Sequence, residues 1–217
     1  MKASRMGVQA IVAIAFMVFA FGVWASGDSL ELRWLRFYSI AVGVVLAALA
    51  AWEHLIWRHR VAQQFTRAPA DISGTWKGTL ETFWKNPDGS SVPSKTVYLV
   101  VRQTASSVSA ALLSDESRSV SSLASVRSDG VTRVLAFLYL NRPKSRHAST
   151  SPMHHGSALL EIAGRPAKRL HGSYWTDRDT RGELDFVRRS TDLADDFEEA
   201  ERVFARQGTD GEPTAAP

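Results

Sequence analysis

Eight short segments with alternating apolar and polar side chains follow one another between residues 73 and 188. They cover residues 73–84, 96–103, 108–113, 119–127, 132–141, 156–163, 169–176 and 182–188. Alternation with a period of two predicts β-strands, and the 3.6-residue period of a helix is absent from all eight. Turn sequences such as Asn86-Pro87-Asp88-Gly89 separate them. Regularly spaced short strands predict either a sandwich or a barrel.

The connections between the segments favour the barrel. Most have the length of a hairpin turn, which suits an eight-stranded up-and-down β-barrel, and closure removes the exposed edges of the sheet. The long polar connection from Asn141 to Met153 is expected at one barrel end. Gly74-Thr75-Trp76 opens the first strand and resembles the first-strand signature of lipocalins and related calycin barrels. That resemblance implies that Trp76 packs across the closed end of the barrel.

Two uncharged apolar runs precede the strands. The first extends from Met6 to Gly27, and the second from Phe37 to Trp52, remaining largely apolar to Trp57. A helix needs about 20 apolar residues to cross the hydrocarbon core of a bilayer. The sequence therefore predicts two N-terminal transmembrane α-helices, at about residues 6–26 and 35–57. A cleaved signal peptide fits less well, because its apolar core spans only about 7–15 residues.

Basic residues around these runs predict the orientation in the membrane. Five flank the outer ends of the pair and two lie in the loop between the runs; the five are Lys2, Arg5, Arg58, Arg60 and Arg67. Lys and Arg near span ends favour the cytoplasmic side. We therefore expect a multi-pass membrane protein with both termini in the cytoplasm. The absence of cysteine agrees with a cytoplasmic domain.

Formal charge divides the chain into three parts. Residues 1–67 carry seven basic and three acidic side chains (net +4), residues 68–190 seventeen and eleven (net +6), and residues 191–217 two and eight (net −6). We predict a transmembrane module over 1–67, a cytoplasmic β-barrel over 68–190, and an acidic helix with a disordered tail over 191–217. Thr191 is the expected N-cap of that short C-terminal helix. Its apolar stripe is expected to pack on the barrel and comprises Leu193, Phe197, Ala200, Val203 and Phe204.

The sequence offers little for catalysis or metal binding. His154 and His155 are adjacent, so on a strand they point to opposite faces, and we expect an exposed pair. Cysteine and a Gly-x-Ser-x-Gly motif are both missing from the sequence. We therefore predict a protein that is not an enzyme and holds neither metal nor cofactor.

Two short motifs, combined with the two spans, resemble one bacterial family. The motifs are Ile72-Ser73-Gly74-Thr75-Trp76-Lys77-Gly78 and Gly172-Ser173-Tyr174-Trp175-Thr176, the second followed by Arg178, Thr180 and Gly182. This layout resembles the two-transmembrane, β-strand-rich effectors of CBASS antiphage signalling, the CD-NTase-associated β-barrel effectors. The resemblance covers most of residues 1–190 and leaves the acidic helix unplaced.

The resemblance implies a function in antiviral defence. The barrel would bind a cyclic oligonucleotide, most simply a cyclic dinucleotide, made by a partner nucleotidyltransferase after phage infection. Binding would drive oligomerisation and disruption of the inner membrane, so that the infected cell dies. DNA and RNA are not expected partners.

The residues themselves allow an anionic, aromatic ligand. Phosphates call for guanidinium groups and bases call for aromatic faces. Strand alternation places Tyr98 with Arg102 on one strand face, Tyr139 with Asn141 on another, and Tyr174 with Thr176 on a third. Arg142 follows Asn141 at the end of its strand, and Arg178 and Thr180 lie in the turn after Thr176. Apart from Asn141, these are the eight candidate ligand residues. Two other functions remain open, a membrane-tethered lipocalin-like carrier of a lipid or other apolar ligand, and an inner-membrane scaffold without a ligand.

Overall fold

The computed structural model describes residues 13–22, 24–25, 34–66, 68–128, 131–149 and 151–209. The chain divides into two compact units, Met1–Ala62 and Gln63–Pro217. In the first unit, residues 13–22 and 24–25 are helical, and α2 (Trp34–His54) is followed by the 3₁₀ turn η1 (Ile56–Arg58). The short helix α3 (Arg60–Phe65) crosses the boundary between the units.

Within the described ranges, every helix falls short of the combined length and apolarity that crossing a bilayer requires. The first predicted span, 6–26, lies partly outside the described residues, and the second, 35–57, contains most of α2 and the first two residues of η1. Both transmembrane spans therefore stay predictions from the sequence.

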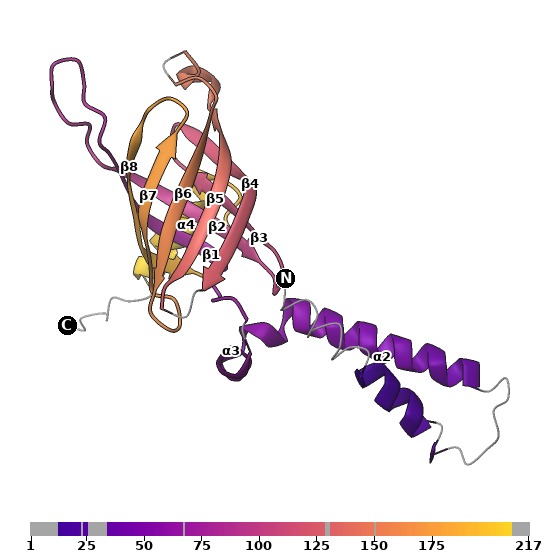
Figure 1. Ribbon diagram of the computed structural model, residues 1–217. Helices are drawn as coiled ribbons and strands as arrows, with labels where there is room; N and C mark the ends of the chain where they lie inside the picture. Colours follow the sequence, from indigo (N-terminus) through magenta and orange to yellow (C-terminus); the bar gives the residue numbers. More distant parts are fainter. Residues whose placement is uncertain are drawn as a thin grey trace, which may run out of the picture. The chain divides into compact units, whose positions relative to one another are not determined.

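The second unit is a closed β-barrel (Figure 1). Its strands are β1 (Gly74–Thr82), β2 (Lys95–Gln103), β3 (Val108–Leu113), β4 (Ser117–Ser128), β5 (Arg133–Pro143), β6 (His154–Ala163), β7 (Arg169–Thr176) and β8 (Arg181–Ser190). Each strand pairs antiparallel with the next along the chain, and β8 pairs with β1. The predicted eight-stranded up-and-down barrel is confirmed, and its strands match the expected segments within a few residues.

The connections between the strands define two ends of the barrel, with an apolar interior between them. The connections 83–94, 114–116, 144–153 and 177–180 form one end, called here the upper end, and segment 68–73 lies at the other, the lower end. The interior between them is apolar, with Leu99, Leu135 and Leu160 each 0% exposed. Trp76 is also fully buried, and its Nε1 donates to the carbonyl of Ile72 at 2.9 Å. Trp76 thus has the packing role at the lower end that the sequence predicts.

The C-terminal helix α4 (Phe197–Thr209) begins later than the sequence predicts. The prediction that Thr191 caps it is wrong, because Oδ1 of Asp196 accepts from the amide of Glu199 at 2.7 Å and supplies the N-cap. Leu193 therefore precedes the helix and is 40% exposed. The rest of the predicted stripe packs on the barrel as expected, and comprises Phe197, Ala200, Val203 and Phe204.

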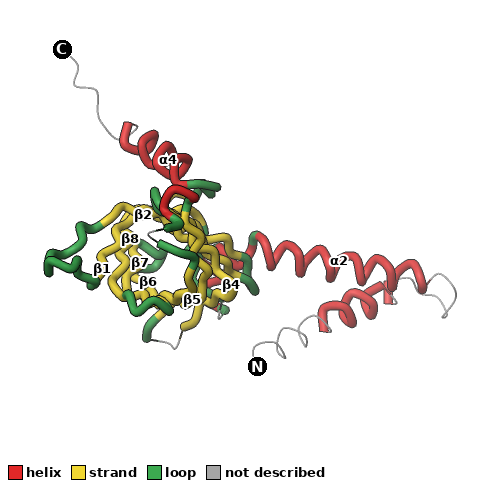
Figure 2. Tube along the Cα trace, turned by 90° about the horizontal axis from the view of Figure 1, so that it is seen from above, coloured by secondary structure: helices red, strands yellow, loops and turns green. Residues whose placement is uncertain are grey.

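Helix α4 lies on the outer face of β2, outside the ring of strands (Figure 2). Its apolar side chains meet Tyr98, Val100 and Leu113. As a result β2 is buried on both of its faces, and the five consecutive residues from Val97 to Val101 are all buried. Strands covered on both faces have continuous apolar runs in place of alternation, which explains the Val-Tyr-Leu-Val-Val sequence.

Candidate functional site

Four of the eight predicted ligand residues lie at the upper end of the barrel: Tyr139, Tyr174, Thr176 and Thr180. The strand register brings them together, because Tyr139 pairs with Gly156 on β6, and Gly156 pairs with Thr176 on β7. Tyr139 and Tyr174 belong to the interior core, at 4% and 8% exposure. The prediction that Tyr174 and Thr176 share one face of a strand agrees with this register.

Two glycines make room for the tyrosine rings. A Cβ atom at Gly156 would lie 2.4 Å from Cζ and from the hydroxyl oxygen of Tyr139. A Cβ at Gly182 would lie 2.8 Å from Cε1 of Tyr174, and 1.9 Å from the carbonyl oxygen of Glu81. Each ring therefore lies over a glycine on the neighbouring strand, and these glycines were not predicted as part of the site. A glycine placed opposite an aromatic residue on the adjacent strand is the signal that could have found them.

Burial strengthens the preference of both tyrosines for the protonated form. Burial raises the pKa of Tyr139, and the negative charges that Tyr174 and Asp177 can carry raise it further. Burial also raises the pKa of Tyr174, although a hydrogen bond with Thr82 opposes the shift. At neutral pH the two hydroxyl groups are therefore uncharged, and each can both donate and accept a hydrogen bond.

The turn between β7 and β8 is held by its own side chains. The hydroxyl groups of Thr176 and Thr180 lie 2.6 Å apart, and the amide of Arg178 donates to Oγ1 of Thr176 at 3.2 Å. Asp179 has a φ of 60°, a left-handed conformation that aspartate tolerates better than most residues. The turn therefore has a defined shape at the rim of the upper end.

A second interior pair comprises Asn141, which the sequence places on the same strand face as Tyr139, and His154, which was not assigned to the site from the sequence. Nδ2 of Asn141 lies 3.3 Å from Nε2 of His154, whose Nδ1 lies 3.0 Å from the carbonyl oxygen of Pro152. His154 is half-buried, so the expectation of an exposed histidine pair is wrong for it and right for His155. Oδ1 of Asn141 is buried and has no hydrogen-bond partner among the described residues. It is an acceptor that a bound donor could satisfy.

The two predicted rim arginines differ in position. Arg178 is exposed, and its Nη1 donates to Oγ of Ser151 at 3.2 Å, which links the β7–β8 turn to the β5–β6 connection. Arg142 follows the inward-facing Asn141 on β5, is exposed, and pairs across the strands with Arg118. Alternation therefore directs Arg142 to the outer face of the barrel. Only Arg178 lies on the turn that the interior threonines shape.

Tyr98 and Arg102 share a face of β2 as predicted, but it is the outer face that α4 covers. The Tyr98 ring lies 5.7 Å from that of Phe204 and 5.2 Å from that of Phe197. Nη2 of Arg102 lies 2.8 Å from Oδ1 of Asp195. The structure therefore does not bring these two residues together with Tyr139 and Tyr174.

The acidic C-terminal segment also uses part of the positive charge of the barrel. Two further basic residues of the barrel contact this segment. Arg118 donates to the backbone carbonyl of Asp195 at 3.0 Å, and Nζ of Lys144 lies 2.9 Å from Oε1 of Glu198. The net charge of +6 over residues 68–190 is thus offset partly within the same chain. Arg178 is not among the basic residues paired in this way.

The upper end combines flat rings, neutral hydroxyl groups and one unsatisfied amide oxygen, with an arginine at its rim. These groups suit the recognition of a flat, polar, anionic molecule by stacking and hydrogen bonding. In the parts of the chain that the structure covers, groups of three His, Asp or Glu side chains arranged as metal ligands are absent.

Comparison with known proteins gives two similarities. A family model described as the Cap15 cyclic dinucleotide receptor domain matches residues 67–188. The CD-NTase-associated protein 15 of Staphylococcus schleiferi is 28% identical over 154 residues, which cover 71% of this chain and 80% of that protein. The family match includes nearly all of the barrel and ends before α4.

Proposed function

Because the chain belongs to the family of Cap15 cyclic dinucleotide receptor domains, we propose that its barrel binds a cyclic dinucleotide at the upper end. In this proposal the protein is a membrane effector of CBASS antiphage defence. Ligand binding promotes self-association, and the N-terminal segment then disrupts the inner membrane and kills the infected cell. The second messenger comes from a partner nucleotidyltransferase, and the protein itself catalyses no reaction.

One observation carries the ligand half of the proposal. Tyr139, Tyr174 and Asn141 bring polar groups to the upper end of the interior, and Oδ1 of Asn141 is buried and lacks a partner among the described residues. A buried acceptor without a partner costs about 1–3 kcal/mol. The amino or imino group of a nucleobase would satisfy it, while the tyrosines offer a ring face or a hydroxyl group to the same base.

The phosphates require positive charge close to these rings. Arg178 is the proposed phosphate contact, because it lies on the turn that places the Thr176 and Thr180 hydroxyl groups and is exposed at the rim. A guanidinium group can donate two parallel hydrogen bonds to one phosphate. We assign Tyr98 and Arg102 to the packing of α4, and Arg142 to the outer surface.

The membrane half of the proposal rests on the sequence. The two apolar runs and the five flanking basic residues support a helical pair in the inner membrane with both termini in the cytoplasm. Small residues in the second run allow close contact between helices of different copies, and include Gly43, Ala47, Ala48 and Ala51. A cytoplasmic barrel would meet an intracellular signal directly.

The packing of the barrel gives less support to a carrier of apolar ligands. The core residues Leu99, Leu135 and Leu160 are 0% exposed, so no water-sized space remains beside these side chains. An acyl chain would have to displace them.

Isothermal titration of the full chain in uncharged detergent micelles against a panel of cyclic di- and trinucleotides tests the proposal. We expect one cyclic dinucleotide to bind, and Arg178→Ala to weaken it about ten- to hundred-fold, as loss of a charge-assisted hydrogen bond does. Arg202→Ala, an exposed arginine of α4, is the matched control and should leave affinity unchanged. Absence of binding to every member of the panel would refute the proposal.

A further inference from the structure

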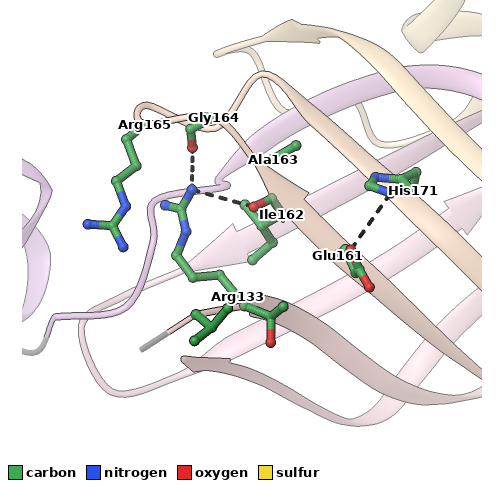
Figure 3. Close-up of a pocket in the computed structure, with 9 residues that line it drawn as sticks. Arg133, Glu161, Ile162, Ala163, Gly164, Arg165 and His171 are labelled. Carbon is green, nitrogen blue, oxygen red and sulfur yellow. Dashed lines mark hydrogen bonds and ion pairs between the residues drawn. The ribbon is translucent and has the colours of Figure 1, made fainter. Parts of the chain in front are cut away.

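A separate cleft lies at the rim of the lower end of the barrel (Figure 3). Its volume is about 330 Å³, and its walls come from the start of β5, the end of β6, the turn at 164–165 and His171 of β7. Arg133 in this cleft and Tyr139 in the candidate site lie six residues apart on β5, or about 20 Å at 3.3 Å per residue. The cleft is therefore distinct from the upper end.

The guanidinium of Arg133 is held by backbone carbonyl groups. Its Nη2 donates to the carbonyl oxygen of Gly164 and, at 3.4 Å, to that of Ile162. Gly164 has a φ of +86°, and a Cβ atom there would lie 2.9 Å from the carbonyl oxygen of Pro166. Glycine is therefore required at position 164. The turn fixes the carbonyl group of Gly164, and that carbonyl orients the guanidinium of Arg133.

Arg165 adds a second positive charge to the same cleft. It follows Gly164 in the turn, and Figure 3 shows its side chain on the same side of the turn as that of Arg133. Burial lowers the pKa of Arg133, and the charge of Arg165 lowers it further, so the two guanidinium groups repel one another. Among the described residues, carboxylates form ion pairs with neither arginine. The carboxylate of Glu161, which also lines the cleft, lies 3.8 Å from Nε2 of His171.

We propose that this cleft binds a phosphate-bearing group between Arg133 and Arg165. An anion there would remove the repulsion. Arg165 can donate paired hydrogen bonds to phosphate oxygens, and Arg133 can add a donor from Nη1, because its Nη2 is engaged by the two carbonyl groups. His171 also lines the cleft, and its Nδ1 is buried and without a partner in the described part of the chain. The volume is at the small end of ligand pockets and suits one phosphate with a small substituent.

The same chemistry fits a soluble phosphate ester and the headgroup of an anionic phospholipid. Two probes separate them, inorganic phosphate and dihexanoyl-phosphatidylglycerol below its micelle concentration. Each is titrated into the full chain in uncharged detergent micelles, with sodium chloride holding the ionic strength constant. Tighter binding of the lipid by ten-fold or more assigns the cleft to a headgroup, and any weaker preference assigns it to a soluble ester.

Arg165→Gln is the decisive variant, because that side chain forms no hydrogen bond or ion pair within the described residues. We expect it to weaken binding of the preferred probe about ten- to hundred-fold without loss of folding. Arg202→Gln is the matched control and should bind as the unchanged protein does. Failure of both probes to bind, or unchanged binding by Arg165→Gln, overturns the proposal.

Arg165→Glu gives a second measurement that needs no ligand. The introduced carboxylate would face Arg133 and replace the repulsion by attraction, so the melting temperature should rise and phosphate should stabilise no further. A fall in melting temperature would contradict the electrostatic basis of the site. Tyr174→Ala, which alters the upper end, should leave phosphate binding unchanged, so that failure of the cyclic dinucleotide proposal and failure of this one can be distinguished.

Discussion

The guanidinium of Arg189 lies over the indole ring of Trp76, 5.4 Å from the ring centroid. The same guanidinium donates to the carbonyl of Ser73 at 2.8 Å and to the carbonyl and carboxylate of Asp71, both at 3.1 Å. One side chain of the last strand therefore joins the first strand to the segment that precedes it. That segment leads from the N-terminal helices into the barrel.

Replacing Arg189 should destabilise the barrel. Arg189→Ala removes the ring contact and leaves the Asp71 carboxylate, whose side chain is 26% exposed, without its cation. We expect a loss of about 2–3 kcal/mol in the free energy of unfolding, measured by urea unfolding. Arg188→Ala is the adjacent control and should cost less, because Arg188 is exposed and lies over the Phe204 ring without an ion pair among the described residues. If both variants lost the same unfolding free energy, the contacts of Arg189 with Trp76 and Asp71 would contribute no special stability to the lower end.

The contribution of Asp71 should depend on pH. Burial raises its pKa, but hydrogen bonds from Ser73 and the charge of Arg189 outweigh burial and hold the pKa below the ordinary value. A lowered pKa stabilises the fold above the unfolded value of about 3.9, and this stability is lost as the pH falls through the folded pKa. At pH 7 the free energy of unfolding of the unchanged protein should therefore exceed that of Asp71→Asn by about 1 kcal/mol. Urea unfolding should show this difference shrinking below about pH 4.

Asp192→Asn is the control for that pH series. Asp192 is exposed, and the variant should retain the pH dependence of the unchanged protein. If the difference in unfolding free energy between the unchanged protein and Asp71→Asn stayed constant at every pH, the lowered pKa of Asp71 would be contradicted.

Gly156→Ala should disturb the candidate site through Tyr139. The added Cβ would lie 2.4 Å from the phenol, so the ring must move, at a cost of about 1–3 kcal/mol. Binding of the cyclic dinucleotide should weaken in parallel. In a double-mutant cycle, Gly156→Ala should cost much less when Tyr139→Ala is already present. Additive costs would show that the ring does not depend on the glycine.

Removing the Phe204 ring should separate packing from ligand binding. Phe204 is 2% exposed and stacks on Tyr98, so Phe204→Ala should cost about 3 kcal/mol in urea unfolding. Cyclic dinucleotide affinity should change less than two-fold, because Tyr98 faces α4 and not the interior. Arg202→Ala on the same helix should alter stability by less than about 0.5 kcal/mol. A large loss of affinity in Phe204→Ala would restore a ligand role to the Tyr98 face.

The sequence identified the strands well because each carries its own signal. The Asn86-Pro87-Asp88-Gly89 turn, for example, has a left-handed glycine and a 2.8 Å hydrogen bond from the Gly89 amide to the Asn86 carbonyl. Such turns depend on a few neighbouring residues and hold in any tertiary setting. The start of α4 was less predictable, because both Thr191 and Asp196 are good N-cap residues and packing on β2 selects between them.

The candidate site shows the same limit. Alternation alone pairs Tyr98 with Arg102 and Tyr174 with Thr176, and both pairings are present in the structure. Alternation does not distinguish the inner face of a strand from the outer face. As a result, four of the eight predicted residues lie at the upper end and Arg178 lies at its rim, whereas the other three lie outside the barrel interior. Asn141 and His154 meet only through the pairing of β5 with β6.

The sequence by itself determined the strand order and the closed barrel, because period-two patterns, turns and short connections are local properties. The packing role of Trp76 was implied by the resemblance of Gly74-Thr75-Trp76 to calycin barrels. Only the tertiary structure decided which face of each strand turns inward. It also placed Arg189 of the last strand over Trp76 of the first strand. The physical reason is that a strand offers two equivalent faces, and the choice between them is made by the neighbours that bury one. For β2 both faces are buried, because α4 covers the outer one.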